Sequence, residues 1–365
     1  MTGIAVDVPA ELSAVEPPEA RGLARDQVRL LVAEPDRLRH LRFTDLPSAL
    51  RPGDLLVVNT SDTEPAAVDG HRPDGRPVAV HVSGPAPAGD GWIVELRATD
   101  GARVHDAAAG ERIELPRGVV LTLLAGHPDA TVGSGSRLWL AGFDPGSVPG
   151  PRPAGDLPSY LRTAGRPIRY SYLRGSWPLG HYRTVFAEPD GGFASAEMPS
   201  AARPFTPAVL DGLAARGVAV ARVVLHTGVS SPEAGETPLP ERFTVPRATA
   251  RAVEATRAAG GRVVAVGTTA TRALETVADP GGRVRAGRGW TDLVLGPDRP
   301  ARAVDGLLTG WHEPQASHLL LLAAVAGPAL VDRAYAAAVD RGYRWHEFGD
   351  SCLLLPGPAS ARRAG

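Results

Sequence analysis

The segment RVVAVGTTATRALE, residues 262–275, decides how the middle of this chain folds. Its branched run Val263–Val266 favours a buried strand, because such side chains suit a pleated surface. The strand ends at Gly267, and Thr268 and Thr269 are expected to cap the following helix. Free backbone N–H groups and the positive end of a helix dipole would then point at one place and suit anionic ligand groups. An ordinary capped helix of an α/β fold has the same local pattern.

The composition is that of a globular protein. The 365 residues are enough for two domains, or for one large domain with an insertion, and 43% are hydrophobic and 22% charged. Lysine is absent, so all 39 basic residues are arginine, which fits a GC-rich coding bias. The net charge of −1 argues against wrapping nucleic acid by bulk electrostatics but allows a local arginine patch.

Three further features indicate a cytoplasmic protein. The single cysteine, Cys352, lies in an apolar run and is expected to be a buried thiol. The N-terminus lacks a basic region followed by a long apolar segment, so no secretory signal is expected. The longest apolar run, residues 319–326, is too short to span a bilayer. We expect a soluble monomer without membrane contact.

The texture of the sequence changes twice along the chain. Before residue 65 it predicts a strand over 28–33, a short helix near 46–50 and a very apolar strand over 55–58. Over residues 66–157, short alternating runs separated by Gly, Asp and Pro turns predict a small all-β barrel, which a Pro/Gly-rich connector (144–155) ends.

From about residue 200 helices and strands alternate. Helices are predicted over 209–215, 246–259, 315–326 and 329–341, with a strand over 218–225. Such crossovers imply a parallel or mixed sheet with helices packed on it. The predicted fold class is therefore α+β, with a mixed-sheet α/β main domain (1–65 and 158–365) interrupted by the barrel domain (66–157).

Polar residues stand at several edges of these elements. Thr291-Asp292, His312 and Gly349-Asp350 each lie where an apolar strand or helix begins or ends, and loop edges on rigid elements often build sites. Each also has a structural interpretation. Thr291-Asp292 suits a capping turn, Gly349-Asp350 suits a turn before a strand, and His312 suits a buried, hydrogen-bonded imidazole.

The order of these motifs carries more information than any one of them. AVGTT, then TD, then VDGLLT with a following histidine and proline, then GD, resembles the S-adenosylmethionine:tRNA ribosyltransferase-isomerase family of queuosine biosynthesis. The resemblance extends upstream and covers most of residues 28–356. The upstream segments are LRFTDLPSALRPGDLLVVN (41–59), LPSYLR (157–162), HYRTVFA (181–187) and VVLHTG (223–228).

The resemblance implies a transferase with S-adenosylmethionine as substrate and no metal or further cofactor. The family moves the ribosyl carbons of S-adenosylmethionine onto the aminomethyl group of a 7-deazaguanine base in tRNA. It rearranges them to an epoxycyclopentanediol and releases adenine and methionine. Such a site must remove a proton beside the sulfonium, stabilise departing adenine, and accept an extruded or single-stranded base.

Residues with matching chemistry are present at the matching motifs. A helix start supplies N–H and hydroxyl donors for the methionine carboxylate or the ribose, an arginine supplies a bidentate contact, and imidazoles transfer protons near neutrality. The expected catalytic residues are His226, His312 and Asp350. The expected substrate-binding residues are Asn59, Tyr182, Thr184, Gly267, Thr268, Thr269, Arg272, Thr291 and Asp292.

Several polar positions depart from the family pattern. Two family arginines are Asp62 and Ala67 here, and a family histidine is Pro204, which cannot transfer a proton. The lost arginines weaken the case for a tRNA backbone, although Arg183 and Arg203 could compensate. Three functions therefore stay open: the family reaction on tRNA, an S-adenosylmethionine-using enzyme with a small-molecule acceptor, and a nucleoside-binding protein without turnover.

Overall fold

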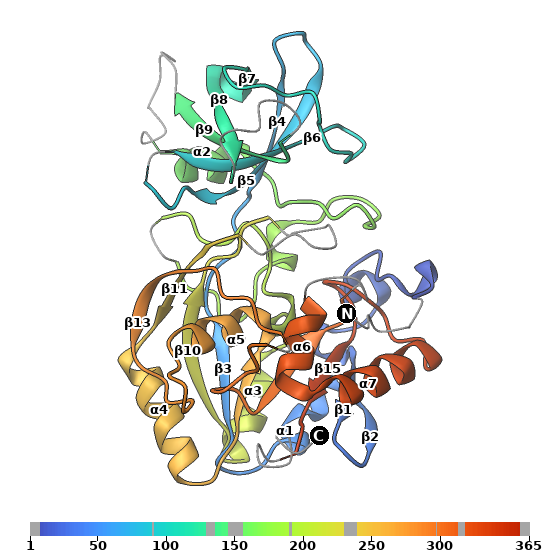
Figure 1. Cartoon of the computed structure of the whole chain (residues 1–365). Helices are drawn as coiled ribbons and strands as arrows, with labels where there is room; N and C mark the ends of the chain where they lie inside the picture. The colour runs from blue at the N-terminus through green and yellow to red at the C-terminus, as the bar shows by residue number, and fades with distance from the viewer. Residues whose placement is uncertain are drawn as a thin grey trace.

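The computed structural model describes residues 8–89, 91–128, 136–144, 156–189, 192–229, 239–296, 298–312 and 318–357. It has two lobes, a nine-stranded mixed sheet covered by helices and a closed six-stranded antiparallel barrel (Figure 1). The predicted fold class is confirmed. The boundaries predicted for the two domains stay a prediction.

Four parallel neighbours form the centre of the large sheet, in the order β10 (Ala219–Leu225), β3 (Leu55–Asn59), β12 (Val263–Val266) and β14 (Gly306–Gly310). The chain enters the barrel within eight residues of the end of β3, so the carboxyl ends of these strands lie on the barrel side of the sheet (Figure 1). This edge is where ligands bind in open α/β sheets.

The remaining strands extend the sheet on both sides. β15 runs antiparallel to β14, and β11 runs antiparallel to β10. Their bounds are β1 (Arg29–Ala33), β2 (Leu38–Arg42), β11 (Glu241–Val245), β13 (Gly287–Thr291) and β15 (Ser351–Leu354).

Helices cover both faces of this sheet. Alternate residues of β3 enter two different apolar clusters, with Leu55 and Val57 on one face and Leu56 and Val58 on the other, as the twofold period of a strand requires. The helices of the main lobe are α1 (Leu46–Ala49), α3 (Pro207–Ala215), α4 (Arg247–Ala258), α5 (Gly267–Thr276), α6 (His318–Ala326) and α7 (Pro328–Asp340). Short 3-10 turns are η1 (Ala10–Leu12), η2 (Pro18–Arg21), η3 (Arg25–Gln27), η4 (Phe43–Asp45), η6 (Leu179–His181) and η7 (Ser200–Ala202).

The helix boundaries follow local chemistry at most ends. Thr206 caps α3 through its hydroxyl, which accepts a hydrogen bond from the Val209 amide at 3.4 Å. The prediction for the start of α5 is wrong, because Gly267 is itself its first residue and Val266 is the N-cap without a side-chain cap. Thr268 and Thr269 lie inside the first turn and are not caps.

The barrel closes in the order β4-β5-β6-β9-β8-β7 around its own apolar core. Helix α2 (Leu157–Ala164) packs on this core, and its Tyr160 hydroxyl donates to the Pro116 carbonyl at 3.0 Å. Most of the predicted connector (145–155) lies outside the described residues. The barrel elements are β4 (Ala67–His71), β5 (Pro77–Pro85), β6 (Trp92–Arg97), β7 (Arg112–Leu115), η5 (Pro116–Gly118), β8 (Val119–His127) and β9 (Leu138–Asp144).

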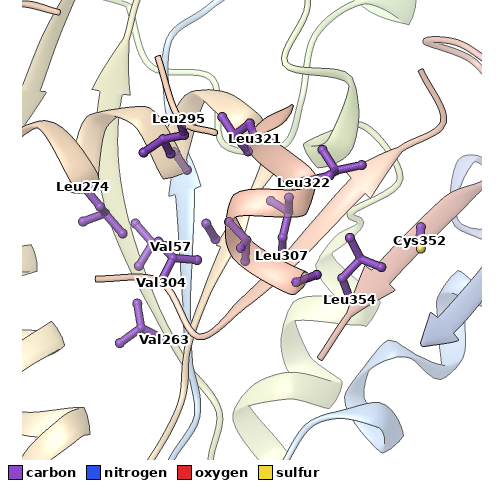
Figure 2. Packing of buried hydrophobic residues seen from close by; sticks show 14 of the residues in the cluster. Val57, Val263, Leu274, Leu295, Val304, Leu307, Leu321, Leu322, Cys352 and Leu354 are labelled. Carbon is purple, nitrogen blue, oxygen red and sulfur yellow. The ribbon is translucent and has the colours of Figure 1, made fainter. Parts of the chain in front are cut away.

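The larger apolar cluster lies between the sheet and helices α4 to α7. Figure 2 shows Val57 and Val263 of the central strands together with Leu274 of α5 and Leu322 of α6. Cys352 lies in this cluster as a buried free thiol, as predicted, and burial raises its pKa. In the described part of the chain no single helix is long and apolar enough to cross a membrane, whereas α6 and α7, bent by 117°, meet the length and composition limits only as a pair.

Candidate active site

Residues predicted to form the site stand at the carboxyl ends of adjacent parallel strands. Asn59 ends β3, His226 follows β10, Gly267 follows β12, and His312 lies two residues after β14. Neighbouring strands are about 4.8 Å apart, so the ends of β10 and β14 are roughly 14 Å apart. The sheet thus brings sequence-distant polar groups to one edge.

Asn59 ties three of these elements together. Its amide mimics a strand partner of Leu225, with Nδ2 donating to the Leu225 carbonyl at 2.8 Å and Oδ1 accepting from its N–H at 3.0 Å. Nδ2 also donates to the Thr269 hydroxyl at 3.3 Å, and Oδ1 accepts from the Ser61 amide at 3.1 Å. The side chain is completely buried. Asn59 therefore holds the edge in shape.

A chain of hydroxyl groups ends on His226. The Nδ1 atom of His226 lies 2.8 Å from the Ser61 hydroxyl oxygen, which lies 2.7 Å from the Ser195 hydroxyl oxygen. Ser195 accepts a hydrogen bond from the Thr227 amide at 3.0 Å. Because an amide N–H only donates, the hydrogen of Ser195 is available to Ser61, and that of Ser61 is available to Nδ1. The direction of these hydrogen bonds and the tautomer of the imidazole determine each other.

His312 lies in a second cluster of imidazoles. Its ring is stacked on His318 with centroids 4.6 Å apart and planes at 10°. Its Nε2 atom lies 3.3 Å from the Thr309 hydroxyl. Burial, together with His318 and His346 nearby, holds the pKa of His312 well below its ordinary value. His312 is therefore a neutral imidazole at physiological pH.

The glycine at the start of α5 has a structural reason to be there. Gly267 has φ +86°, a left-handed conformation that favours glycine, and an added Cβ would lie 3.5 Å from that of Ala201. Thr268 and Thr269 follow it in the first turn, where amide groups have no partner within the helix. Both threonines are partly exposed. This turn is suited to an anionic ligand group.

Arg272 and Thr291 are committed to contacts within the protein. The Arg272 guanidinium forms an ion pair with Glu241 and donates to the carbonyls of Leu293 and Thr291, at 3.1 and 3.2 Å. The Thr291 hydroxyl lies 2.6 Å from that of Thr276. These contacts hold the segment after β13 on α5, whereas Asp292 one residue later is exposed.

Asp350 organises the loop that precedes β15. Its carboxylate accepts from the Arg29 amide at 2.7 Å and from the Arg344 amide at 2.8 Å, and it forms an ion pair with the Arg29 side chain. The loop between Arg344 and Asp350 is thereby closed on itself. Asp350 thus holds this loop in place, and its predicted catalytic role stays a prediction.

Tyr182 and Thr184 lie under the same loop. The Tyr182 ring packs edge-on against Phe348 at 5.4 Å, and burial raises the pKa of its hydroxyl. The Thr184 hydroxyl accepts from the Phe186 amide at 3.3 Å. Both side chains are buried, and neither is among the described residues that line a hollow.

Two hollows open along this edge. One, of about 450 Å³, lies between the barrel and the sheet and is lined by His226, Arg242, Trp290 and barrel residue His127. The other, of about 270 Å³, lies beyond β14. It is lined by eleven residues, which include Ser200, Pro204, Gly310, Glu347 and Asp350. His226 lines only the first hollow, and His312 is not among the described residues that line either one.

Sequence reasoning missed Ser61 and Ser195. Ser61 lies two residues after β3, in the segment singled out for its altered arginine, and Ser195 lies in a loop without any pattern. Their roles depend on a contact across 134 positions of the chain. The sequence offered one signal for Ser61: it is a serine just after a strand of an α/β sheet, where ligands usually bind.

The arginines considered as replacements for the lost ones are neutralised. Arg183 forms an ion pair with Asp62, with Nε donating to Oδ1 at 3.0 Å. Asp62, which stands where the family has an arginine, is therefore the carboxylate that neutralises Arg183. Arg203 is buried, pairs with Glu19 and lies over the Phe348 ring at 4.8 Å.

Comparison with known proteins gives a consistent picture. A family model described as queuosine biosynthesis protein matches residues 4–354. The S-adenosylmethionine:tRNA ribosyltransferase-isomerase of Symbiobacterium thermophilum is 35% identical over 359 residues, which cover 96% of this chain and 98% of that protein. The protein of the same name from Acidiphilium cryptum is 37% identical over 362 residues, which cover 95% and 96% of the two chains.

The chain is also similar to a solved structure over most of its length. The crystal structure of S-adenosylmethionine tRNA ribosyltransferase from Thermotoga maritima has a TM-score of 0.50 and 29% sequence identity. The match covers 96% of this chain and 99% of that one.

Proposed function

This chain belongs to the S-adenosylmethionine:tRNA ribosyltransferase-isomerase family, and from that premise we propose that the carboxyl edge of its parallel strands holds S-adenosylmethionine against a tRNA base. The protein is a transferase-isomerase of queuosine biosynthesis. The observation that carries the site assignment is the set of polar side chains that β10, β3, β12 and β14 bring to this edge.

His226 is the hydrogen-bond donor to the departing adenine in this proposal. In this arrangement Ser195 donates to Ser61, and Ser61 donates its hydroxyl hydrogen to Nδ1 of His226. The neutral imidazole then carries its own hydrogen on Nε2. Adenine leaves as its ring nitrogens gain electron density, and an Nε2–H stabilises that density as it forms. His226 also lines the hollow between the lobes, together with Arg242 and Trp290.

His312 is the proton acceptor in this proposal. The base must remove a proton from the carbon next to the sulfonium, which the positive sulfur acidifies. A base must be unprotonated beforehand, and the lowered pKa keeps His312 in that form. His318 stacks on its ring and limits its orientation.

The first turn of α5 is the site for the methionine carboxylate or the ribose hydroxyls. Gly267 lets the backbone approach, and the amides of Thr268 and Thr269 supply donors at the positive end of the helix. Arg272 supports this turn through Glu241 and the segment after β13, and Asp350 supports the loop on the other side.

In this proposal, arginines of one local segment bind the phosphate groups of the tRNA acceptor. The segment RPIRYSYLRGSWPLGHYR (166–183) has four arginines and no acidic residue. Arg166 and Arg183 are paired with Asp69 and Asp62, whereas Arg169 and Arg174 are exposed and form no ion pair with another described residue. Exposed arginines suit phosphate contacts. We further propose that the protein acts as a monomer.

Release of adenine and methionine tests the proposal directly. The protein is incubated with S-adenosylmethionine and a tRNA that carries the aminomethyl-deazaguanine base, and with the same tRNA carrying guanine. Release that requires the aminomethyl base supports the proposal. Release without tRNA, or with a small amine in its place, contradicts the tRNA acceptor, and saturable nucleoside binding without release contradicts the proposed catalytic roles.

A further inference from the structure

The loop before β15 holds one residue in a strained backbone conformation. His346 has φ +69°, in the left-handed region that is unfavourable for a residue with a Cβ. The Gly349 amide donates to its carbonyl at 2.9 Å, and the His346 amide donates to the Trp311 carbonyl at 3.2 Å. The loop is therefore fixed against the end of β14, immediately before His312.

The strain places the imidazole in a stack of rings. His346 lies on Tyr172 with centroids 4.4 Å apart and planes at 23°, and Tyr172 lies on Tyr170 at 5.7 Å and 10°. The tyrosines come from the basic segment 166–183, so the stack joins that segment to the sheet edge. Flat, electron-rich walls of this kind attract cations and heteroaromatic rings.

A carboxylate without a cation lies beside this stack. Glu347 lines the hollow beyond β14, and its Oε2 atom is shielded from solvent without a hydrogen-bond partner among the described residues. Burial raises its pKa to about 7. Tyr172 Oη and Trp177 Nε1 are likewise shielded and unsatisfied in the described structure. Of these three residues only Glu347 lines the hollow, and its unsatisfied oxygen there indicates a missing polar partner.

The neighbouring charges leave this carboxylate uncompensated. Arg203 lines the same hollow, but its guanidinium is bound to Glu19 and to the His181 carbonyl. Glu197 lies close enough, together with Glu347, to raise the pKa of Tyr170. Glu347 therefore has no ion-pair partner among the described residues, and the rings of His346 and Phe348 line the hollow beside it. A ligand with a positive charge on a flat ring would satisfy both properties.

We propose that Glu347, His346 and Tyr172 recognise the acceptor base, with its ring stacked on the aromatic wall and its protonated aminomethyl group bound to the Glu347 carboxylate. The inference rests on the proposed function and names the subsite for the second substrate. It assigns the hollow beyond β14 to the acceptor and leaves the hollow at His226 for the nucleoside.

The substitution Glu347→Gln tests this subsite. Gln keeps the shape but loses the negative charge, so we expect the KM for the aminomethyl tRNA to rise at least tenfold and the dissociation constant of S-adenosylmethionine to stay unchanged. The control is Glu254→Gln on α4, a carboxylate far along the chain whose contacts are with the 283–284 turn. An unchanged KM for the tRNA in Glu347→Gln would overturn the inference.

A stability measurement separates recognition from a structural role. Replacing a carboxylate that stabilises the fold lowers the melting temperature. Replacing a buried carboxylate without a partner raises the melting temperature, because an unpaired buried charge destabilises the fold. We expect Glu347→Gln to melt at a higher temperature than the unliganded wild type at pH 8. A lower melting temperature, together with normal acceptor binding, would place Glu347 in the framework and reject the subsite.

Binding of the free base keeps this test independent of the proposed function. Calorimetric titration with 7-aminomethyl-7-deazaguanine and with guanine is run on the wild type and on Glu347→Gln. Preference for the amine that disappears in the variant supports the subsite, even if the wild type releases no adenine with tRNA and the proposed function fails. No preference for the amine, either as free base or in tRNA, overturns the inference.

Discussion

The Nδ1 atom of His226 and the hydroxyl oxygen of Ser61 lie 2.8 Å apart, and this contact joins the imidazole to the Ser61–Ser195 pair of hydroxyl groups. Ser61 is itself oriented by Ser195, which a backbone amide orients in turn. In the proposed mechanism, two serines that contribute no charge thus direct the proton of His226. A histidine that must donate to a leaving group needs such an arrangement.

Replacement of Ser61 by Ala should lower kcat and leave S-adenosylmethionine binding intact. Without the Ser61 hydroxyl both tautomers of His226 become accessible, so we expect kcat to fall about ten- to a hundredfold, part of the usual contribution of a general acid. Single-turnover adenine release and calorimetry measure the two quantities. Ser48→Ala on α1 removes an exposed hydroxyl as a control. Equal kcat in both variants would exclude the hydroxyl chain from the chemistry.

Separation of the Asp62–Arg183 ion pair should strengthen tRNA binding. Asp62→Ala leaves the half-exposed Arg183 without its carboxylate, which frees one cation for a phosphate. We expect the slope of log K against log salt to steepen by about one, as for one added phosphate contact. Filter binding at several salt concentrations measures it. The double variant Asp62→Ala/Arg183→Gln should return to the wild-type slope. A slope that stays steep in the double variant would show that Arg183 is not the added phosphate contact.

Arg272 should matter for stability more than for substrate binding. Its removal leaves Glu241, whose pKa burial already raises, as an unpaired carboxylate. For Arg272→Met we expect a loss of unfolding free energy of about 3 kcal/mol, the usual cost of breaking a buried pair. Urea denaturation measures this loss, and Arg251→Met on the exposed side of α4 is the control.

Two further measurements separate this role from a substrate contact. Arg272→Met/Glu241→Gln should recover much of the lost stability, because it removes the stranded charge. An increase of the dissociation constant for S-adenosylmethionine of tenfold or more, at unchanged stability, would instead place Arg272 in the binding site.

The sequence predicted elements better than contacts. The branched run before Gly267 and the apolar run before Asn59 are strands at the predicted places, since composition and period determine a buried strand locally. The start of α5 differs from the prediction because Gly267 is already helical, and the Thr269 hydroxyl, inside the first turn, accepts from Asn59, which comes from 210 positions away. The role of Arg272 likewise depends on Glu241 on a neighbouring strand. Such partners are set by the topology of the sheet, which local patterns do not encode.

The pH dependence of stability should identify Glu347 as an uncompensated carboxylate. Burial raises its pKa from 4.5 to about 7, so between these values the folded protein holds a proton that the unfolded chain has lost. The free energy of unfolding must therefore fall as the pH rises through this window.

Glu347→Gln cannot ionise and lacks this loss of stability. Its unfolding free energy relative to the wild type should increase by up to about 3 kcal/mol between pH 4.5 and pH 8, since each pKa unit corresponds to about 1.4 kcal/mol. Urea denaturation of both proteins at matched pH values measures the difference, and Glu254→Gln is run as the matched control. If the Glu347→Gln difference were flat, the carboxylate would have a partner in the folded protein, and its charge would not be available to an incoming amine.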